Sequence, residues 1–291
     1  MFHVVAYIDI TCHRMILHDP NPKHLILNLL LAAEGEALTS SEAVNACALF
    51  GVRENSVRVA LVRLTTAGMI EAADRGSYQL GPQAAGMAGD IASWRSSEKR
   101  VRPWKGDWIA VHLGGLRRSD RVAQRARDRA LAMLGLRELE SGLYIRPDNL
   151  AGGVAVVRER LHTLGLDAHA PVFIAQQFDA EREQRARKLW DGKALSKTYR
   201  DTRRKMENWL MRAAELEPDV AARESYLVGH DAIRQLVFDP LLPEPLVDVD
   251  ERRAFVDAVV KFDRAGHAIW QGLQSVPTRG SVSNLAVTRT H

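Results

Sequence analysis

The chain has 291 residues, 46% of them hydrophobic and 26% charged, with 40 Lys and Arg against 36 Asp and Glu. This composition is that of a globular protein, the length favours two or three domains, and a net charge of only +4 leaves nucleic-acid binding to be judged from where the basic residues lie. Two cysteines, Cys12 and Cys47, are too few for a disulfide framework or a cysteine-rich zinc site, so we expect a reducing, cytoplasmic environment.

Residues 1–19 are interpreted as an N-terminal extension. Asp9, His13 and Arg14 interrupt the apolar stretch at 1–17, which therefore predicts neither a signal peptide nor a membrane span. Met15 is an alternative start of translation. No other apolar run has the length needed to cross a bilayer, and we expect no membrane association.

Residues 20–82 predict three helices followed by a β-hairpin. Asn21 and Pro22 are typical of a helix start, and Thr39 with Glu42 has the spacing of a capping box at the start of a second helix. In the third helix, "ENSVRVALVRLTT", the apolar residues Val57, Leu61 and Leu64 recur at i, i+4 and i+7, so this face should pack against the first two helices. Two short strands with a turn near residues 74–76 follow.

This order of elements is typical of a winged helix-turn-helix domain, whose third helix enters the major groove while the hairpin contacts the backbone or minor groove. The side chains that face outward from the third helix and the hairpin are predicted to contact DNA: Asn55, Ser56, Arg58, Val59, Arg63, Arg75 and Ser77. Arginine suits this role because its guanidinium can pair with guanine O6 and N7 or with phosphate oxygens. The alternative is a winged helix that contacts protein, with solvated arginines.

Residues 83–103 are interpreted as a linker, and residues 104–178 as a domain with the order βαββαβ, which is that of the ferredoxin-like fold. Arg118, Arg121, Arg125 and Arg129 share one face of the first helix of this domain. They form either a solvated basic face or a second phosphate-contacting surface.

Residues 179–274 read almost entirely as helix, and residues 275–291 lack periodicity and are predicted to be a disordered tail. Two apolar stripes in the helical region are typical of a core or a dimer interface. The first contains Tyr199, Thr202, Met206, Trp209, Leu210 and Ala213, and the second contains Ala254, Phe255, Ala258, Val259, Phe262, Ala265 and Ile269. No phosphate-binding loop, Rossmann fingerprint, nucleophile elbow or zinc-protease motif is present, so we predict no catalytic residue, cofactor or metal site.

A series of segments, taken together, resembles the PaaX-like family, the phenylacetic acid degradation repressors. In the family's order these are "HLILNLLL", "ENSVRVALVRLTTAGMIEA", "DRGSYQL", "WKGDWIAVHL", "LGLRELESGLYIRPDNL", "LWDGKALSKTYRD" and "IRQLVFDPLLPEPLV", which span roughly residues 20–247. After Pro245 the chain departs from the family's pattern, because "VDVDERRAF" stands where a second proline and a tryptophan–glycine pair are expected.

The resemblance implies a homodimeric cytoplasmic transcription factor of the α+β class, with an N-terminal winged helix-turn-helix, a middle ferredoxin-like domain similar to Cas2 and a helical C-terminal domain. It implies a repressor that binds a double-stranded operator of an aromatic-acid catabolic operon, of the phenylacetate type. Phenylacetyl-CoA or another acyl-CoA would release it. A metal-dependent nuclease that uses the Cas2-like domain is the alternative, although the first strand of that domain ends in "HLGG" and has no acid there.

An acyl-CoA effector needs cations for its phosphates and an apolar slot for its acyl group. Residues near the junction of the middle and C-terminal domains are candidates for both: Trp190, Tyr199, Arg200, Arg203, Arg204 and Arg234. The alternative for these arginines is that they form the solvated side of a helix.

Overall fold

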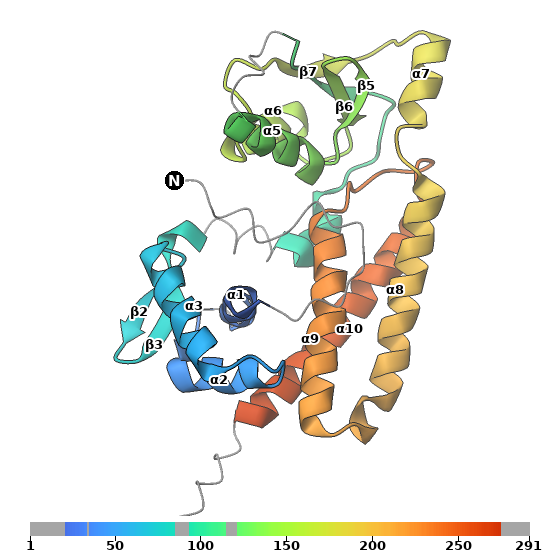
Figure 1. Ribbon diagram of the computed structural model, residues 1–291. Helices are drawn as coiled ribbons and strands as arrows, with labels where there is room; N and C mark the ends of the chain where they lie inside the picture. Colours follow the sequence, from blue (N-terminus) through green and yellow to red (C-terminus); the bar gives the residue numbers. More distant parts are fainter. Residues whose placement is uncertain (1–20, 34, 85–92, 115–120, 275–291) are drawn as a thin grey trace, which may run out of the picture.

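The computed structural model describes residues 21–33, 35–84, 93–114 and 121–274 (Figure 1). It combines long helices with two small antiparallel sheets, which confirms the α+β class. The predicted N-terminal extension, the predicted tail at 275–291, Cys12 and Arg118 lie outside the described residues. None of the described helices is long and apolar enough to cross a membrane.

The N-terminal part of the chain folds around three helices, which are α1 (Pro22–Ala32), α2 (Ser40–Ala48) and α3 (Glu54–Thr66). The predicted helix starts are present. The Asn21 side chain accepts a hydrogen bond from the Lys23 amide at 3.0 Å, and Thr39 and Glu42 form the capping box with bonds of 3.1 and 2.7 Å. Residues from all three helices make the core of this part: Leu25, Ile26, Leu30, Ala43, Cys47, Val57, Ala60, Leu61 and Leu64.

Three strands complete this part, β1 (Leu38–Thr39), β2 (Ile70–Asp74) and β3 (Ser77–Leu80), in the sheet order β1-β3-β2. The β2–β3 hairpin turns at Gly76, whose φ of +78° is a left-handed conformation that glycine adopts without strain. The Gly76 carbonyl accepts hydrogen bonds from the Ser40 amide at 2.9 Å and from its hydroxyl at 3.2 Å. The start of α2 therefore holds the tip of the hairpin in place.

The middle part is a four-stranded sheet with two helices on one face. Its elements are β4 (Trp108–His112), α5 (Arg121–Met133), β5 (Arg137–Glu140), β6 (Leu143–Pro147), α6 (Gly153–Thr163) and β7 (Val172–Ala175), and the sheet order is β5-β6-β4-β7. Because side chains alternate along a strand, Ile109 and Val111 share a core with α5 and α6, whereas Trp108 and Ala110 belong to the core of the C-terminal helices.

The C-terminal part is formed by α7 (Ala180–Arg187), α8 (Gly192–Arg212), α9 (Pro218–Val237) and α10 (Val249–Gln274). The two apolar stripes face each other within the chain. The ring of Tyr199 stacks on Phe255 at 5.7 Å, and the rings of Trp209 and Phe262 lie 4.8 Å apart. The stripes therefore form an intramolecular core, which was one of the two predicted alternatives.

The described part of the predicted linker is packed into the structure. Trp94, in the short 3-10 helix η2 (Ser93–Ser96), is only 1% exposed. Its neighbour Arg95 forms an ion pair of 2.7 Å with Asp263 of α10. This segment therefore attaches to the C-terminal helices.

The segment "FDPLLPEPLV", residues 238–247, joins the middle sheet to the C-terminal helices. The fully buried guanidinium of Arg146 on β6 donates to the carbonyl oxygens of Leu134 and Pro240, and to Oδ1 of Asn149 at 3.0 Å. Asn149 in turn donates to the carbonyl of Leu241 at 2.6 Å. Burial lowers the pKa of Arg146 to about 10, so the group stays cationic at neutral pH.

A second buried contact fixes the same segment to α8 and α10. The Tyr199 hydroxyl donates to Asp239 at 2.6 Å, and Arg252 donates to the Leu242 carbonyl at 2.6 Å and to Glu98 at 2.7 Å. Burial raises the pKa values of both Tyr199 and Asp239. A protonated tyrosine is therefore the donor in this pair.

Candidate functional site

The outer face of α3 is polar and accessible. Because Val57, Ala60, Leu61 and Leu64 turn inward, the remaining positions of the helix face solvent. All five residues predicted on this helix are exposed: Asn55, Ser56, Arg58, Val59 and Arg63. Two apolar side chains also stand on this surface, Val59 at 42% and Val62 at 66% exposure.

The two arginines of α3 have different surroundings. The Arg58 guanidinium pairs with Glu54, one turn earlier, through contacts of 2.6 and 2.9 Å. Both side chains are well exposed, so this ion pair contributes little to folding stability and can exchange partners. Arg63 has no ion-pair partner among the described residues.

The hairpin supplies the other predicted residues. Arg75 is exposed at the turn, next to Asp74, whose carboxylate accepts a hydrogen bond from the Arg75 amide at 2.6 Å. Ser77 is half-buried on β3, where it pairs with Thr39 of β1. Of the seven predicted residues, Ser77 is thus the least accessible to a partner.

In Figure 1, α3 and the hairpin lie on the side of the N-terminal part that is turned away from α9 and α10. The C-terminal helices therefore leave the outer face of α3 uncovered. Arg53, which immediately precedes α3 and is exposed, adds a cation that the sequence analysis did not select. The sequence signal for Arg53 was its position immediately before the helix that is predicted to contact DNA.

The six residues predicted to bind an effector do not all come together at one site. Trp190 is buried, stacks on Trp108 at 6.1 Å and donates to the Gly135 carbonyl, and Tyr199 is buried beside Asp239. Neither ring lines the cavity described below. Arg234 lies on α9 and lines the cavity described below, which none of the three arginines of α8 lines.

The arginines of α8 pair with neighbouring carboxylates. Arg200 and Arg203 reach the same carboxylate, Glu251 of α10, at 3.7 and 3.4 Å, and Arg204 contacts Asp201 at 3.0 Å. The phosphates of an effector would have to compete with these carboxylates for the arginines.

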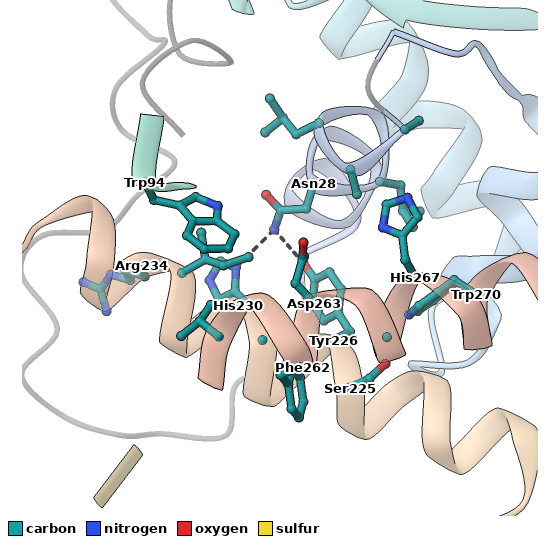
Figure 2. A pocket seen from close by; sticks show the side chains of 18 of the residues that line it. Asn28, Trp94, Ser225, Tyr226, His230, Arg234, Phe262, Asp263, His267 and Trp270 are labelled. Carbon is teal, nitrogen blue, oxygen red and sulfur yellow. Dashed lines mark hydrogen bonds between the residues drawn. The ribbon is translucent and has the colours of Figure 1, made fainter. Parts of the chain in front are cut away.

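A cavity lies elsewhere, between α1 on one side and α9 and α10 on the other, and it has a volume of about 590 Å³ (Figure 2). Apolar side chains form much of its wall: Leu29, Leu31, Ile233, Val259, Phe262 and Trp270. Trp94 and Arg95 of η2 line it as well, and Arg234 is the one predicted effector residue that does so.

Three polar residues connect α1 to α9 inside this cavity. The Asn28 amide nitrogen lies 2.7 Å from the Tyr226 hydroxyl and 3.3 Å from Nδ1 of His230, as Figure 2 shows. The rings of Tyr226 and His230 are stacked at 5.9 Å, and Tyr226 also meets the edge of Phe50 at 5.1 Å. This contact fixes α1 against α9.

Burial changes the acid–base properties of these groups. It raises the pKa of Tyr226 to about 12 and lowers the pKa of His230, where the nearby Arg234 adds to the lowering and Asp231 opposes it. His230 is still accessible to small molecules because it faces the cavity. Both groups are therefore neutral near pH 7.

Sequence reasoning missed this cavity because its residues are far apart in the chain. Asn28 was the available signal, because it is a polar residue within the apolar run "LILNLLL". In the described ranges, no group of three or more His, Cys, Asp or Glu side chains is arranged to hold a metal ion.

Comparisons with known proteins give two family matches. The model described as "PaaX-like protein" matches residues 21–84, and the model described as "PaaX-like protein C-terminal domain" matches residues 190–272. Among solved structures, the uncharacterized protein Rv0674 from Mycobacterium tuberculosis is 22% identical and has a TM-score of 0.60, with 87% of this chain and 99% of that chain covered. At this identity the likeness concerns the fold alone. No curated protein matches.

Proposed function

Because the chain belongs to the PaaX-like family, we propose that it is a transcriptional regulator that binds duplex DNA through α3 and the β2–β3 hairpin. Residues 21–84 would be a winged helix-turn-helix, which the order of three helices and a hairpin and the sheet order β1-β3-β2 support. The βαββαβ order and the sheet order β5-β6-β4-β7 support a ferredoxin-like middle domain, followed by a helical C-terminal domain.

The observation that carries this proposal is the uncovered outer face of α3. A recognition helix reads bases with the side chains of its N-terminal turns, and Asn55, Ser56 and Val59 occupy these turns. Asn and Ser can hydrogen-bond to base edges, and an exposed valine can contact the methyl group of thymine. Arg63 and Arg75 are suited to guanine or to the phosphate backbone on either side.

By its resemblance to the family, the regulator would act as a repressor of an aromatic-acid catabolic operon, in the cytoplasm, and an acyl-CoA such as phenylacetyl-CoA would release it. It would bind as a homodimer, because a two-fold symmetric protein matches a pseudo-palindromic operator. The apolar stripes of α8 and α10 are used within the chain. A homodimer would therefore have to form through another surface of the protein.

The metal-dependent nuclease is not proposed, since no specific observation favours it. One experiment separates the two functions. The full-length protein is incubated with labelled duplex DNA and magnesium at low salt, and the products are resolved on native and on denaturing gels. The proposal predicts a retarded band with DNA of unchanged length. Shortened DNA, or no retardation at any protein concentration, would contradict it.

A further inference from the structure

The cavity between α1 and the α9–α10 pair has the size and lining of a small-molecule site. Its volume of about 590 Å³ lies within the range of roughly 300–1,000 Å³ that is usual for ligand pockets. Aromatic rings contribute to several of its walls, from Trp94, Tyr226, Phe262 and Trp270. These walls suit a planar apolar group, which stacks well on aromatic side chains.

Two glycines are part of the wall of this cavity. Gly229 of α9 and Gly266 of α10 line the cavity from inside long helices, where glycine is unfavourable. Neither adopts a left-handed conformation, and an added Cβ would meet only ordinary contacts, 3.4 Å from the Phe262 ring and 3.6 Å from Cβ of Ser225. The backbone therefore requires glycine at neither position. A side chain larger than alanine at either position would have to extend toward the neighbouring helix or into the cavity that both glycines line.

The polar groups of the cavity determine what part of a ligand they can bind. An amide nitrogen can only donate, so Nδ1 of His230 accepts from Asn28, and the ring proton resides on Nε2. No described residue accepts a hydrogen bond from this Nε2–H group. A neutral donor in an aromatic cavity suits a carbonyl or carboxylate oxygen.

We propose that this cavity binds the acyl part of the regulator's effector, an aromatic acid or its thioester, with its carbonyl oxygen at His230 and its ring among the aromatic walls. The regulatory meaning of the site rests on the proposed function. The ligand would touch both α1 and α9–α10, and α1 packs directly on α3 (Figure 1). A ligand whose contacts depend on the spacing of these helices favours one orientation of the N-terminal part.

The test is calorimetric titration of the full-length protein, without DNA, with a panel of aromatic acids and their CoA thioesters, including phenylacetate and phenylacetyl-CoA, and with CoA alone. The site predicts that at least one acid or thioester binds, whereas CoA alone does not. Comparison of each acid with its thioester identifies which form is the ligand. If no member of the panel binds, the site assignment is wrong.

Variants of cavity residues test whether the ligand binds in this cavity. Gly266→Leu should fill the cavity and lower the affinity at least tenfold, whereas Gly272→Leu, on the same helix but with open space around it, should keep the parent affinity. His230→Phe preserves the stacked ring but removes the Nε2 donor, together with the acceptor of the Asn28 contact, and it should lower the affinity about fivefold. If Gly266→Leu does not fold, His230→Phe decides. Unchanged affinity in the folded variants would overturn the assignment.

Measuring DNA affinity with and without the ligand separates this inference from the proposed function. The ligand should weaken DNA binding by the parent and by Gly272→Leu, but not by Gly266→Leu. If the parent binds no DNA at all, the proposed function fails, while the titrations without DNA still decide whether the cavity is a ligand site. If the ligand binds in the cavity without changing DNA affinity, its role as the effector is refuted.

Discussion

Arg58 and Arg63 are both exposed on α3, but only Arg58 has a carboxylate beside it among the described residues. The cation of Arg63 is therefore available to DNA without the loss of an existing ion pair. We expect Arg63→Ala to weaken binding to a preferred duplex by roughly 1–3 kcal/mol if Arg63 contacts a base. Arg223→Ala removes an exposed arginine from α9 and is the matched control. Equal affinities of the two variants in a fluorescence-anisotropy titration would refute this role for Arg63.

Glu54 provides a second prediction at the scale of residues. Its carboxylate neutralises Arg58 and would also repel phosphates. Glu54→Gln should therefore raise the affinity for any duplex, whatever its sequence, by about two- to fivefold at low salt, because an exposed ion pair of this kind is worth only about 0.2–1 kcal/mol. The gain should shrink as salt is added. A loss of affinity, or a gain for one sequence only, would contradict the electrostatic explanation.

At the scale of elements, the contact between α1 and α9 should respond to pH. The pKa of His230 is lowered in the folded protein, mainly by burial, from an ordinary value of 6.5. The unfolded chain then binds more protons than the folded chain as pH falls through about 6.5, so acid removes stability. Asp263 and His267 of α10 also line the cavity. Both are unchanged in the His230→Phe variant, which is compared with the parent below.

We therefore expect the melting temperature of the parent to fall more steeply between about pH 7.5 and about pH 5.5 than that of His230→Phe. The reason is that a phenylalanine at position 230 cannot bind a proton. Thermal unfolding followed by circular dichroism in a series of buffers measures both curves. Parallel curves would show that His230 does not contribute to the pH dependence.

The elements themselves could be predicted from the sequence because their signals are local. The cap at Asn21 and the capping box of Thr39 and Glu42 depend on residues within one turn of each other. The two-residue strand β1 has no such signal, because only its pairing with Ser77 and Tyr78 defines it. The cavity was missed for the same reason, since Asn28 and His230 come together only through tertiary packing.

At the scale of the whole molecule, the middle sheet is joined to the C-terminal helices through Arg146. Replacing it leaves the Leu134 and Pro240 carbonyls and the Asn149 amide oxygen without their donor. Arg146→Met should therefore lower the free energy of unfolding by about 2–4 kcal/mol. Arg137→Met, at an exposed position of β5, should change it by about 0.5 kcal/mol or less. Urea unfolding measures both, and similar midpoints would contradict the role given to Arg146.

The central claim is that α3 reads a DNA sequence, and selection from randomised duplexes tests it most directly. The full-length protein is used to retain bound duplexes over several rounds, and the retained pool is sequenced. We expect an enriched inverted repeat whose half-sites lie about one helical turn, roughly 10 base pairs, apart. The double variant Arg58→Ala/Arg63→Ala, shown to be folded, should lose the enrichment. A pool without any enriched sequence, or the same sequence enriched by the double variant, would contradict the claim.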